Sequence, residues 1–229
     1  MQYEIKGNTT PVVICDLQEG EPVITECGSM VWMSPNMEMR TLTGGIGSAF
    51  GRLFSGDSFF INSYTPYGGP GKIAFASNFP GTIAAIQITP ETPIIIQKSA
   101  FLAAESTVNV SMYLQNKLRT GFFGGEGFIM QKLSGNGIAF VELDGFCEEY
   151  PLAEDEEIII NTGNLAMMSA SCSIDIKMVK GVKNLLLGGE GVFHTKVKGP
   201  GNVVVQSMTL TDMAGALYHH MPIMQNNQQ

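Results

Sequence analysis

The sequence predicts an all-β protein made of three tandem β-sandwich units, packed as one compact body in a pseudo-threefold arrangement. Two features of composition point to short strands joined by tight turns. Glycine accounts for 27 of the 229 residues, and charged residues make up only 15%, against about 25% in an average domain. Apolar residues make up 44%, so the chain can bury a sizeable core. The third observation, an internal repeat, divides the chain into units.

Four blocks of sequence recur at a constant offset of 64 residues, as between Gly124 and Gly188. The paired blocks are Ile94–Ile96 with Ile158–Ile160, Val108 and Val110 with Cys172 and Ile174, Phe122–Phe128 with Leu186–Val192, and Gly135–Gly137 with Gly199–Gly201. Four blocks in one register are hard to produce by chance. We therefore interpret residues 86–150 and 151–229 as two copies of one unit.

A more divergent copy precedes these two. Its blocks are Val23-Ile24 followed by Met30–Trp32, similar to Ile94-Ile95 followed by Phe101–Ala103; Phe54–Phe59, similar to the glycine-rich block; and Gly69–Gly71, similar to the Gly-x-Gly block. The offsets drift from 71 to 66 residues, as loops of unequal length would produce. Residues 1–85 are therefore predicted to form the first unit.

Each copy is predicted to run through the same elements in order. An apolar strand and an alternating strand come first, and one or two helical turns, the glycine-rich block, a Gly-x-Gly hairpin turn and a buried strand follow. In the second copy these elements are Ile94–Ile96, Thr107–Ser111, Leu114–Phe123, Gly124–Gly127, Gly135–Gly137 and Ile138–Val141. In the third copy Val203–Val205 is the closing strand, and the polar tail from Met221 to Gln229 is predicted to be dispensable.

The glycine-rich blocks carry a resemblance to a known family. Arg52–Phe60 and Gly121–Gly127, each followed by a Gly-x-Gly block and apolar strands, resemble the bacterial branch of the altered-inheritance-of-mitochondria family, a domain of unknown function. The resemblance covers nearly the whole chain. It implies tandem units similar to the tryptophan RNA-binding attenuation protein, a short relative of the double-stranded β-helix, and no established catalysis. It transfers no RNA-binding residues, because the chain lacks clustered lysines with aromatics.

The repeat places one carboxylate at the equivalent position of each copy, namely Asp57, Glu126 and Glu190. If these groups converged on a pseudo-threefold axis, they could hold a hard cation such as Ca²⁺ or Mg²⁺. The simpler interpretation is that each carboxylate caps backbone N–H groups of its own glycine turn. No second ligand residue repeats beside them, so we favour the capping role and expect no metal, cofactor or catalytic residue.

Two further motifs are interpreted as structural. The segment Thr43–Gly51 lacks the Gly-Lys-Ser/Thr of a phosphate loop and the third glycine of GxGxxG, so we predict a close-packed or flexible turn. His194, His219 and His220 are the only imidazoles. Without an HxxxH spacing, a surface pair near the chain end is favoured over a metal site.

A methionine-rich stretch surrounds the single tryptophan. Met30, Met33, Met37 and Met39 lie close to Trp32 in the sequence. Methionine fills irregular gaps in cores and also lines adaptable binding surfaces. Core filling is the default expectation, whereas an exposed patch would mark a partner surface.

Charge and cysteine content restrict the partners and the compartment. A net charge of −8 argues against a nucleic-acid groove, which needs a basic stripe. The apolar runs are too short to span a bilayer, and the first residues lack an apolar signal segment. Cys15, Cys27, Cys147 and Cys172 have no close metal-binding spacing, and we interpret them as buried thiols of a cytoplasmic protein.

These observations predict a non-enzymatic scaffold or binding protein of the cytoplasm. A protein or a small molecule is the expected partner, self-association is left open, and neither nucleic acid nor stable membrane insertion is expected. One alternative is a metal-dependent protein or enzyme that uses the repeated carboxylates. The other is a peripheral membrane module that inserts Phe and Met side chains at loop tips.

Overall fold

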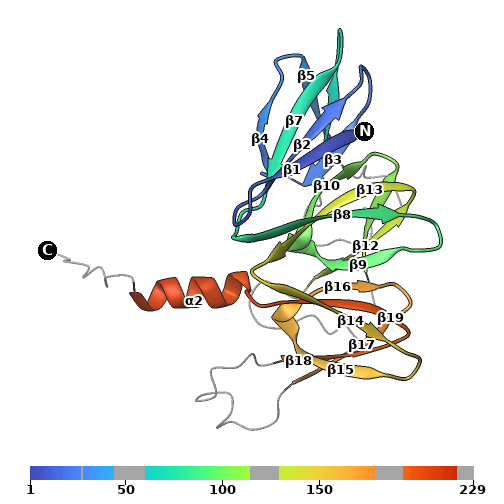
Figure 1. The fold of residues 1–229 in the computed structure, drawn as a ribbon, viewed down its shortest axis with the longest axis vertical. Helices are drawn as coiled ribbons and strands as arrows, with labels where there is room; N and C mark the ends of the chain where they lie inside the picture. Colours follow the sequence, from blue (N-terminus) through green and yellow to red (C-terminus); the bar gives the residue numbers. More distant parts are fainter. Residues whose placement is uncertain (27, 44–59, 114–128, 179–192, 221–229) are drawn as a thin grey trace, which may run out of the picture.

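The computed structural model describes residues 1–26, 28–43, 60–113, 129–178 and 193–220 of the chain. Within these residues it contains nineteen strands in four antiparallel sheets, two short 3-10 turns and one α-helix. The sheets follow one another along the long axis of the molecule (Figure 1). The all-β prediction is therefore confirmed.

We name the sheets A to D and give their strands in spatial order. Sheet A contains β1 (Gln2–Lys6), β2 (Val12–Leu17), β7 (Gly71–Ala76) and β4 (Met30–Met33). Sheet B contains β5 (Met37–Thr43), β6 (Phe60–Pro66), β3 (Val23–Glu26), β10 (Phe101–Glu105), β13 (Gly137–Asp144) and β8 (Gly81–Ile88). Sheet C contains β11 (Val108–Met112), β12 (Met130–Gly135), β9 (Ile94–Gln97), β16 (Leu165–Ser169), β19 (Gly201–Gln206) and β14 (Cys147–Leu152). Sheet D contains β15 (Glu157–Asn161), β18 (Phe193–Lys198) and β17 (Ser173–Met178).

The same strand order occurs three times along the chain. We call β2–β7, β8–β13 and β14–β19 the first, second and third strand groups. In each group the third, sixth and first strands are neighbours in one sheet, and the fourth, fifth and second strands are neighbours in the next. Strand β1 is an addition to the first group. Strands β8 and β14 start at Gly81 and Cys147, so the groups divide a few residues before positions 85 and 150.

Successive groups are joined edge to edge by equivalent strands. Strand β3 of the first group pairs with β10 of the second, and β9 of the second pairs with β16 of the third. The register is the same at both junctions, since Ala104 lies opposite Ile24 and Met168 lies opposite Ile95. Each inner sheet is therefore assembled from three strands of one group and three strands of the next.

A shared β-bulge makes the three groups still more alike. Pairing slips by one residue between Met30 and Trp32 in β4, between Phe101 and Ala103 in β10, and between Leu165 and Met167 in β16. A bulge sharpens the local twist of a strand. Its recurrence at one place in each group means that β4, β10 and β16 have equivalent shapes.

Three apolar clusters fill the spaces between successive sheets. Residues of sheets A and B form the first, those of sheets B and C the second, and those of sheets C and D the third. Phe75, Ile88 and Ile95 are completely buried. Burial of such side chains contributes about 1.5–3 kcal/mol each, so the sheets are held together chiefly by apolar packing.

The Gly-x-Gly blocks do not form the predicted hairpins. Strand β12 lies in sheet C, and β13, which follows it, lies in sheet B, so the block at Gly135–Gly137 carries the chain from one sheet to the next. Gly135 has a φ of 99°, and a Cβ built there would lie 2.4 Å from the Thr107 carbonyl oxygen. Glycine is required because the backbone passes against β11's entry turn in a left-handed conformation.

The chain also contains a helix that the repeat did not predict. Helix α2 (Leu210–His220) follows β19 and projects from the side of the sheets (Figure 1). The Thr209 hydroxyl accepts a hydrogen bond of 3.0 Å from the Asp212 backbone N–H and donates one of 2.7 Å to the Asp212 carboxylate. This cap begins the helix, and the Thr-x-x-Asp spacing is the sequence signal that could have predicted it.

Candidate functional site

The residues predicted as candidate ligands are only partly described by the structure. Asp57, Glu126 and Glu190 lie outside the described residues, as do the glycine-rich blocks, the predicted helical turns beside them and the tail from Met221. His194 lies on β18, whereas His219 and His220 end helix α2 rather than a strand. Among the described residues, no group of three or more His, Cys, Asp and Glu side chains could hold a metal ion.

Strand β4 is the most exposed apolar element of the sheets. It forms one edge of sheet A, and Val31, Trp32 and Met33 are 52%, 48% and 38% exposed. The default expectation that the methionines around Trp32 fill the core is therefore wrong for this strand. Met37 alone of the neighbouring methionines is buried, at 6%, while Met39 is exposed. The pattern matches the other expectation, a partner surface.

The equivalent strands β10 and β16 are buried because another strand covers their edge. Ala103 and Ala104 are completely buried against β3, and Met168 is 1% exposed against β9. Trp32 and Met33 occupy the equivalent places in β4. Their exposure follows from position in the chain rather than from strand character, since no described strand precedes β4 to cover it.

The opposite end of the molecule carries a second open edge. Strand β15 lies at one side of sheet D and belongs to the third group, as β3 and β9 belong to the first and second. Ile159 is 68% exposed, whereas its equivalents Ile24 and Ile95 are 7% and 0% exposed. Open apolar edges offer unpaired backbone groups to another strand.

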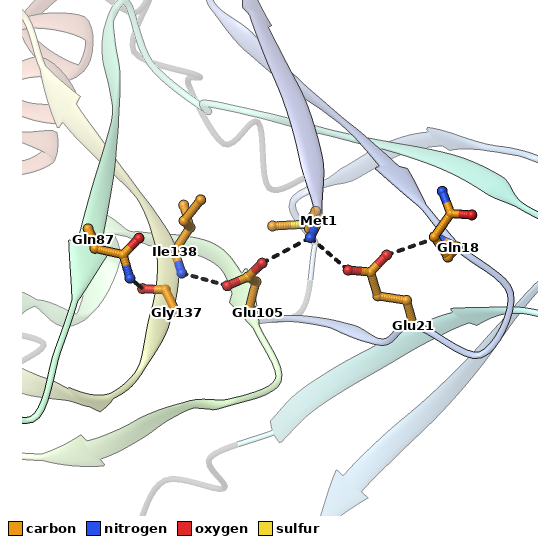
Figure 2. A network of polar contacts seen from close by, with 7 residues as sticks. All are labelled: Met1, Gln18, Glu21, Gln87, Glu105, Gly137 and Ile138. Carbon is orange, nitrogen blue, oxygen red and sulfur yellow. Dashed lines mark hydrogen bonds and ion pairs between the residues drawn. The ribbon is translucent and has the colours of Figure 1, made fainter.

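An ionic network ties the first residues to the second strand group (Figure 2). The α-ammonium group of Met1 lies 2.7 Å from the Glu21 carboxylate and 3.2 Å from that of Glu105. Glu105 also accepts a hydrogen bond of 2.9 Å from the Ile138 backbone N–H. The hydrogen bond from Glu21 raises the pKa of the Met1 ammonium group, and the same bond lowers the pKa of Glu21. The network holds β1 and the turn before β3 against sheet B.

The second strand group contains a buried acidic pair on β13. Glu142 is 7% exposed, and its carboxylate accepts a hydrogen bond of 3.2 Å from the Asn78 backbone N–H. Burial raises the pKa of Glu142 to about 7, and the nearby charge of Asp144 acts in the same direction. Burial also raises the pKa of Asp144, whose Oδ1 atom has no hydrogen-bond partner. A group with a pKa of about 7 can hold or release a proton near neutral pH.

A second buried polar contact joins sheets B and C. The Gln131 side chain is completely buried and donates a hydrogen bond of 2.6 Å to the Glu26 carboxylate. Burial raises the pKa of Glu26, whereas the Gln131 hydrogen bond and the charge of Lys98 oppose this shift. The pair links β3 of the first group to β12 of the second, across the space between the sheets.

The cysteines and the helix complete the description of candidate features. Cys15 and Cys172 are buried and unpaired, as predicted, and Cys147 is half-buried and unpaired; Cys27 lies outside the described residues. Burial raises the pKa of Cys15 to about 12, which keeps this thiol protonated and unreactive. No helix in the described part of the chain is long and apolar enough to cross a membrane.

Comparison with known proteins now places the chain in a family. The family model described as Mitochondrial biogenesis AIM24 matches residues 3–208. The chain belongs to the AIM24 family. A member from Streptococcus pyogenes serotype M6, an uncharacterised protein, is 30% identical over 224 residues, which are 94% of this chain and 89% of that protein.

A solved AIM24-like structure has the same fold. It is the crystal structure of a Streptococcus pyogenes protein determined as a structural genomics target. It covers 96% of this chain and 99% of its own, with a TM-score of 0.79 and 28% sequence identity. The resemblance carried by the glycine-rich blocks is therefore confirmed for this AIM24 family member.

Proposed function

We propose that this AIM24 family protein is a non-enzymatic scaffold or binding protein of the cytoplasm that acts through strand β4. The observation that supports the proposal is the exposure of Val31, Trp32 and Met33 at an open edge of sheet A. Aromatic and methionine side chains are enriched at protein interfaces. An open strand edge adds backbone hydrogen bonds to the contact.

The chemistry of the edge favours a protein partner over a small molecule. A partner strand can satisfy the outward-facing N–H and C=O groups of β4 and cover three apolar side chains at once. The unpaired thiols of Cys15, Cys147 and Cys172 support a reducing compartment. The proposal needs no catalytic group, and the buried acidic pair on β13 is treated as part of the fold.

Site-specific photo-cross-linking tests the proposal. A photoreactive amino acid is placed at Trp32 and, as a matched control, at Leu217, an exposed apolar residue on helix α2. We expect a covalent protein adduct from position 32 and none from position 217 in cells that express the chain. Absence of any adduct from position 32, or equal adducts from both positions, contradicts the proposal.

A further inference from the structure

The two outer sheets are the two halves of an inner sheet. Sheet B runs from β5 to β8, with β3 and β10 meeting at its centre, and sheet C has the equivalent order with β9 and β16 at its centre. Sheet A ends on β4, the equivalent of β10 and β16, and sheet D ends on β15, the equivalent of β3 and β9. Placing β4 beside β15 would build a third composite sheet with the same central order.

The two edges cannot meet within one chain as the structure has it. Strands β4 and β15 lie in the first and last sheets along the long axis, separated by sheets B and C (Figure 1). A second copy of the chain, however, always brings the missing partner, because every copy carries both edges. We infer that the chain associates head to tail, with β4 of one copy pairing with β15 of the next.

The register of this contact follows from the two junctions already present. Ala103 faces Thr25 and Met167 faces Ile96, so Trp32, at the same place in its group, is expected opposite Ile160. One residue further, Ala104 faces Ile24 and Met168 faces Ile95. The matching intermolecular pair is Met33 with Ile159.

Burial at the existing junctions shows what the contact would do to these side chains. At the place of Met33, Ala104 and Met168 are 0% and 1% exposed, against 38% for Met33 itself. At the place of Ile159, Ile24 and Ile95 are 7% and 0% exposed, against 68%. The large apolar side chains left open at the two ends are those that an equivalent strand covers elsewhere in the molecule. Each edge therefore has a complementary occupant, and this occupant is the other edge.

This contact is heterologous, because two different surfaces meet, and it leaves one free edge at each end of a pair. Such contacts produce rings when the rotation closes and open filaments when it does not. The inference rests on the proposed function, since it names the partner of β4 as a second copy of the chain. The experiment therefore separates failure of self-association from failure of the β4 surface.

Two lysine variants block one edge each. Met33→Lys places a charge on β4, and Ile159→Lys places one on β15; both positions are exposed in the single chain, so the fold tolerates the change. Leu217→Lys, on helix α2, is the matched control. Sedimentation velocity over a wide range of concentration measures the mass, and circular dichroism confirms that each variant is folded.

The expected results are specific to head-to-tail pairing. The wild-type chain and Leu217→Lys should associate as the concentration rises, whereas each edge variant alone should sediment at the mass of one chain. An equal mixture of the two edge variants retains one intact β4 and one intact β15. It should form a species of twice the monomer mass and no larger one, because the remaining edges both carry lysine.

Three outcomes overturn the inference: a wild-type chain that stays monomeric, edge variants that keep the wild-type mass, or a mixture of edge variants that stays monomeric. In each case the adduct from position 32 still decides the proposed function. An adduct with a different protein would keep β4 as a binding surface and reject self-association. No adduct at all would reject both.

Discussion

Two equivalent corners of the molecule make the same hydrogen bond with side chains of different charge. At the corner between β7 and β8, the Asn78 backbone N–H donates to the Glu142 carboxylate at 3.2 Å. At the corner between β13 and β14, the Asp144 backbone N–H donates to the Gln206 amide oxygen, also at 3.2 Å. Glu142 and Gln206 are 64 residues apart and occupy the same place in β13 and β19.

The comparison shows that the corner requires an acceptor and not a charge. Glu142 and Gln206 are both buried, at 7% and 6% exposure, but only Glu142 carries a group whose ionised form burial disfavours. The pKa of Glu142 is raised from 4.5 to about 7. The folded state therefore binds a proton that the unfolded state has released, and stability present below pH 4.5 is lost as the pH rises to about 7.

The largest expected effect comes from giving the second corner the acid of the first. Gln206→Glu places a buried carboxyl group beside Asp144, whose own pKa is raised. At pH 8 we expect the free energy of unfolding to fall by about 3–4 kcal/mol, at ~1.4 kcal/mol per unit of pKa shift. Chemical denaturation at pH 8 and pH 4 measures it. Asn202→Asp, an added acid at an exposed site on the same strand, is the control and should change little.

The reverse exchange should stabilise the first corner. Glu142→Gln keeps the acceptor for the Asn78 N–H and removes the titrating group. The free energy of unfolding should rise by up to about 3 kcal/mol at pH 8 and stay unchanged at pH 4, since both states of the wild type are then largely protonated. Glu149→Gln, at an exposed position of β14, controls for the loss of a charge. A gain of equal size at both pH values would mean that packing, not ionisation, sets the difference.

A smaller effect separates the hydrogen bond from the charge. Gln206→Ala leaves the Asp144 backbone N–H without its acceptor. We expect a loss of about 1–2 kcal/mol, with the same value at pH 4 and pH 8 because no titrating group is added. Comparing denaturation midpoints of Gln206→Ala and Gln206→Glu at both pH values checks this. A loss at pH 8 only would show that Gln206 acts on the titration of Asp144 instead.

The constant offset of 64 residues predicted the strands that make these corners equivalent. It aligned Ile94–Ile96 with Ile158–Ile160, which became β9 and β15, and it drew Met30–Trp32 into line with Phe101–Ala103. These predictions succeeded because apolar spacing records which strand faces are buried. The offset did not indicate which strands pair, so Gly135–Gly137 was taken as a hairpin although its two strands belong to different sheets.

The candidate site depended on information that one chain's composition does not contain. Trp32 and Met33 have the composition of core residues, and at equivalent places in β10 and β16 such positions are core. Whether they are buried depends on a strand that the first group lacks. Helix α2 was missed for a different reason: the repeat has no counterpart for it, and its Thr209 cap is a purely local signal.

The sharing of sheets B and C has a consequence for dissecting the chain into parts. No cut between strand groups separates two finished bodies, because each inner sheet loses half of its strands at the cut. A fragment ending after the second group would leave β9 without β16 and would turn the buried side chains of Ile95 and Ile96 into a new adhesive border. The protein is therefore closer to a woven fabric than to a row of beads, and a shortened version would fray at its new margin.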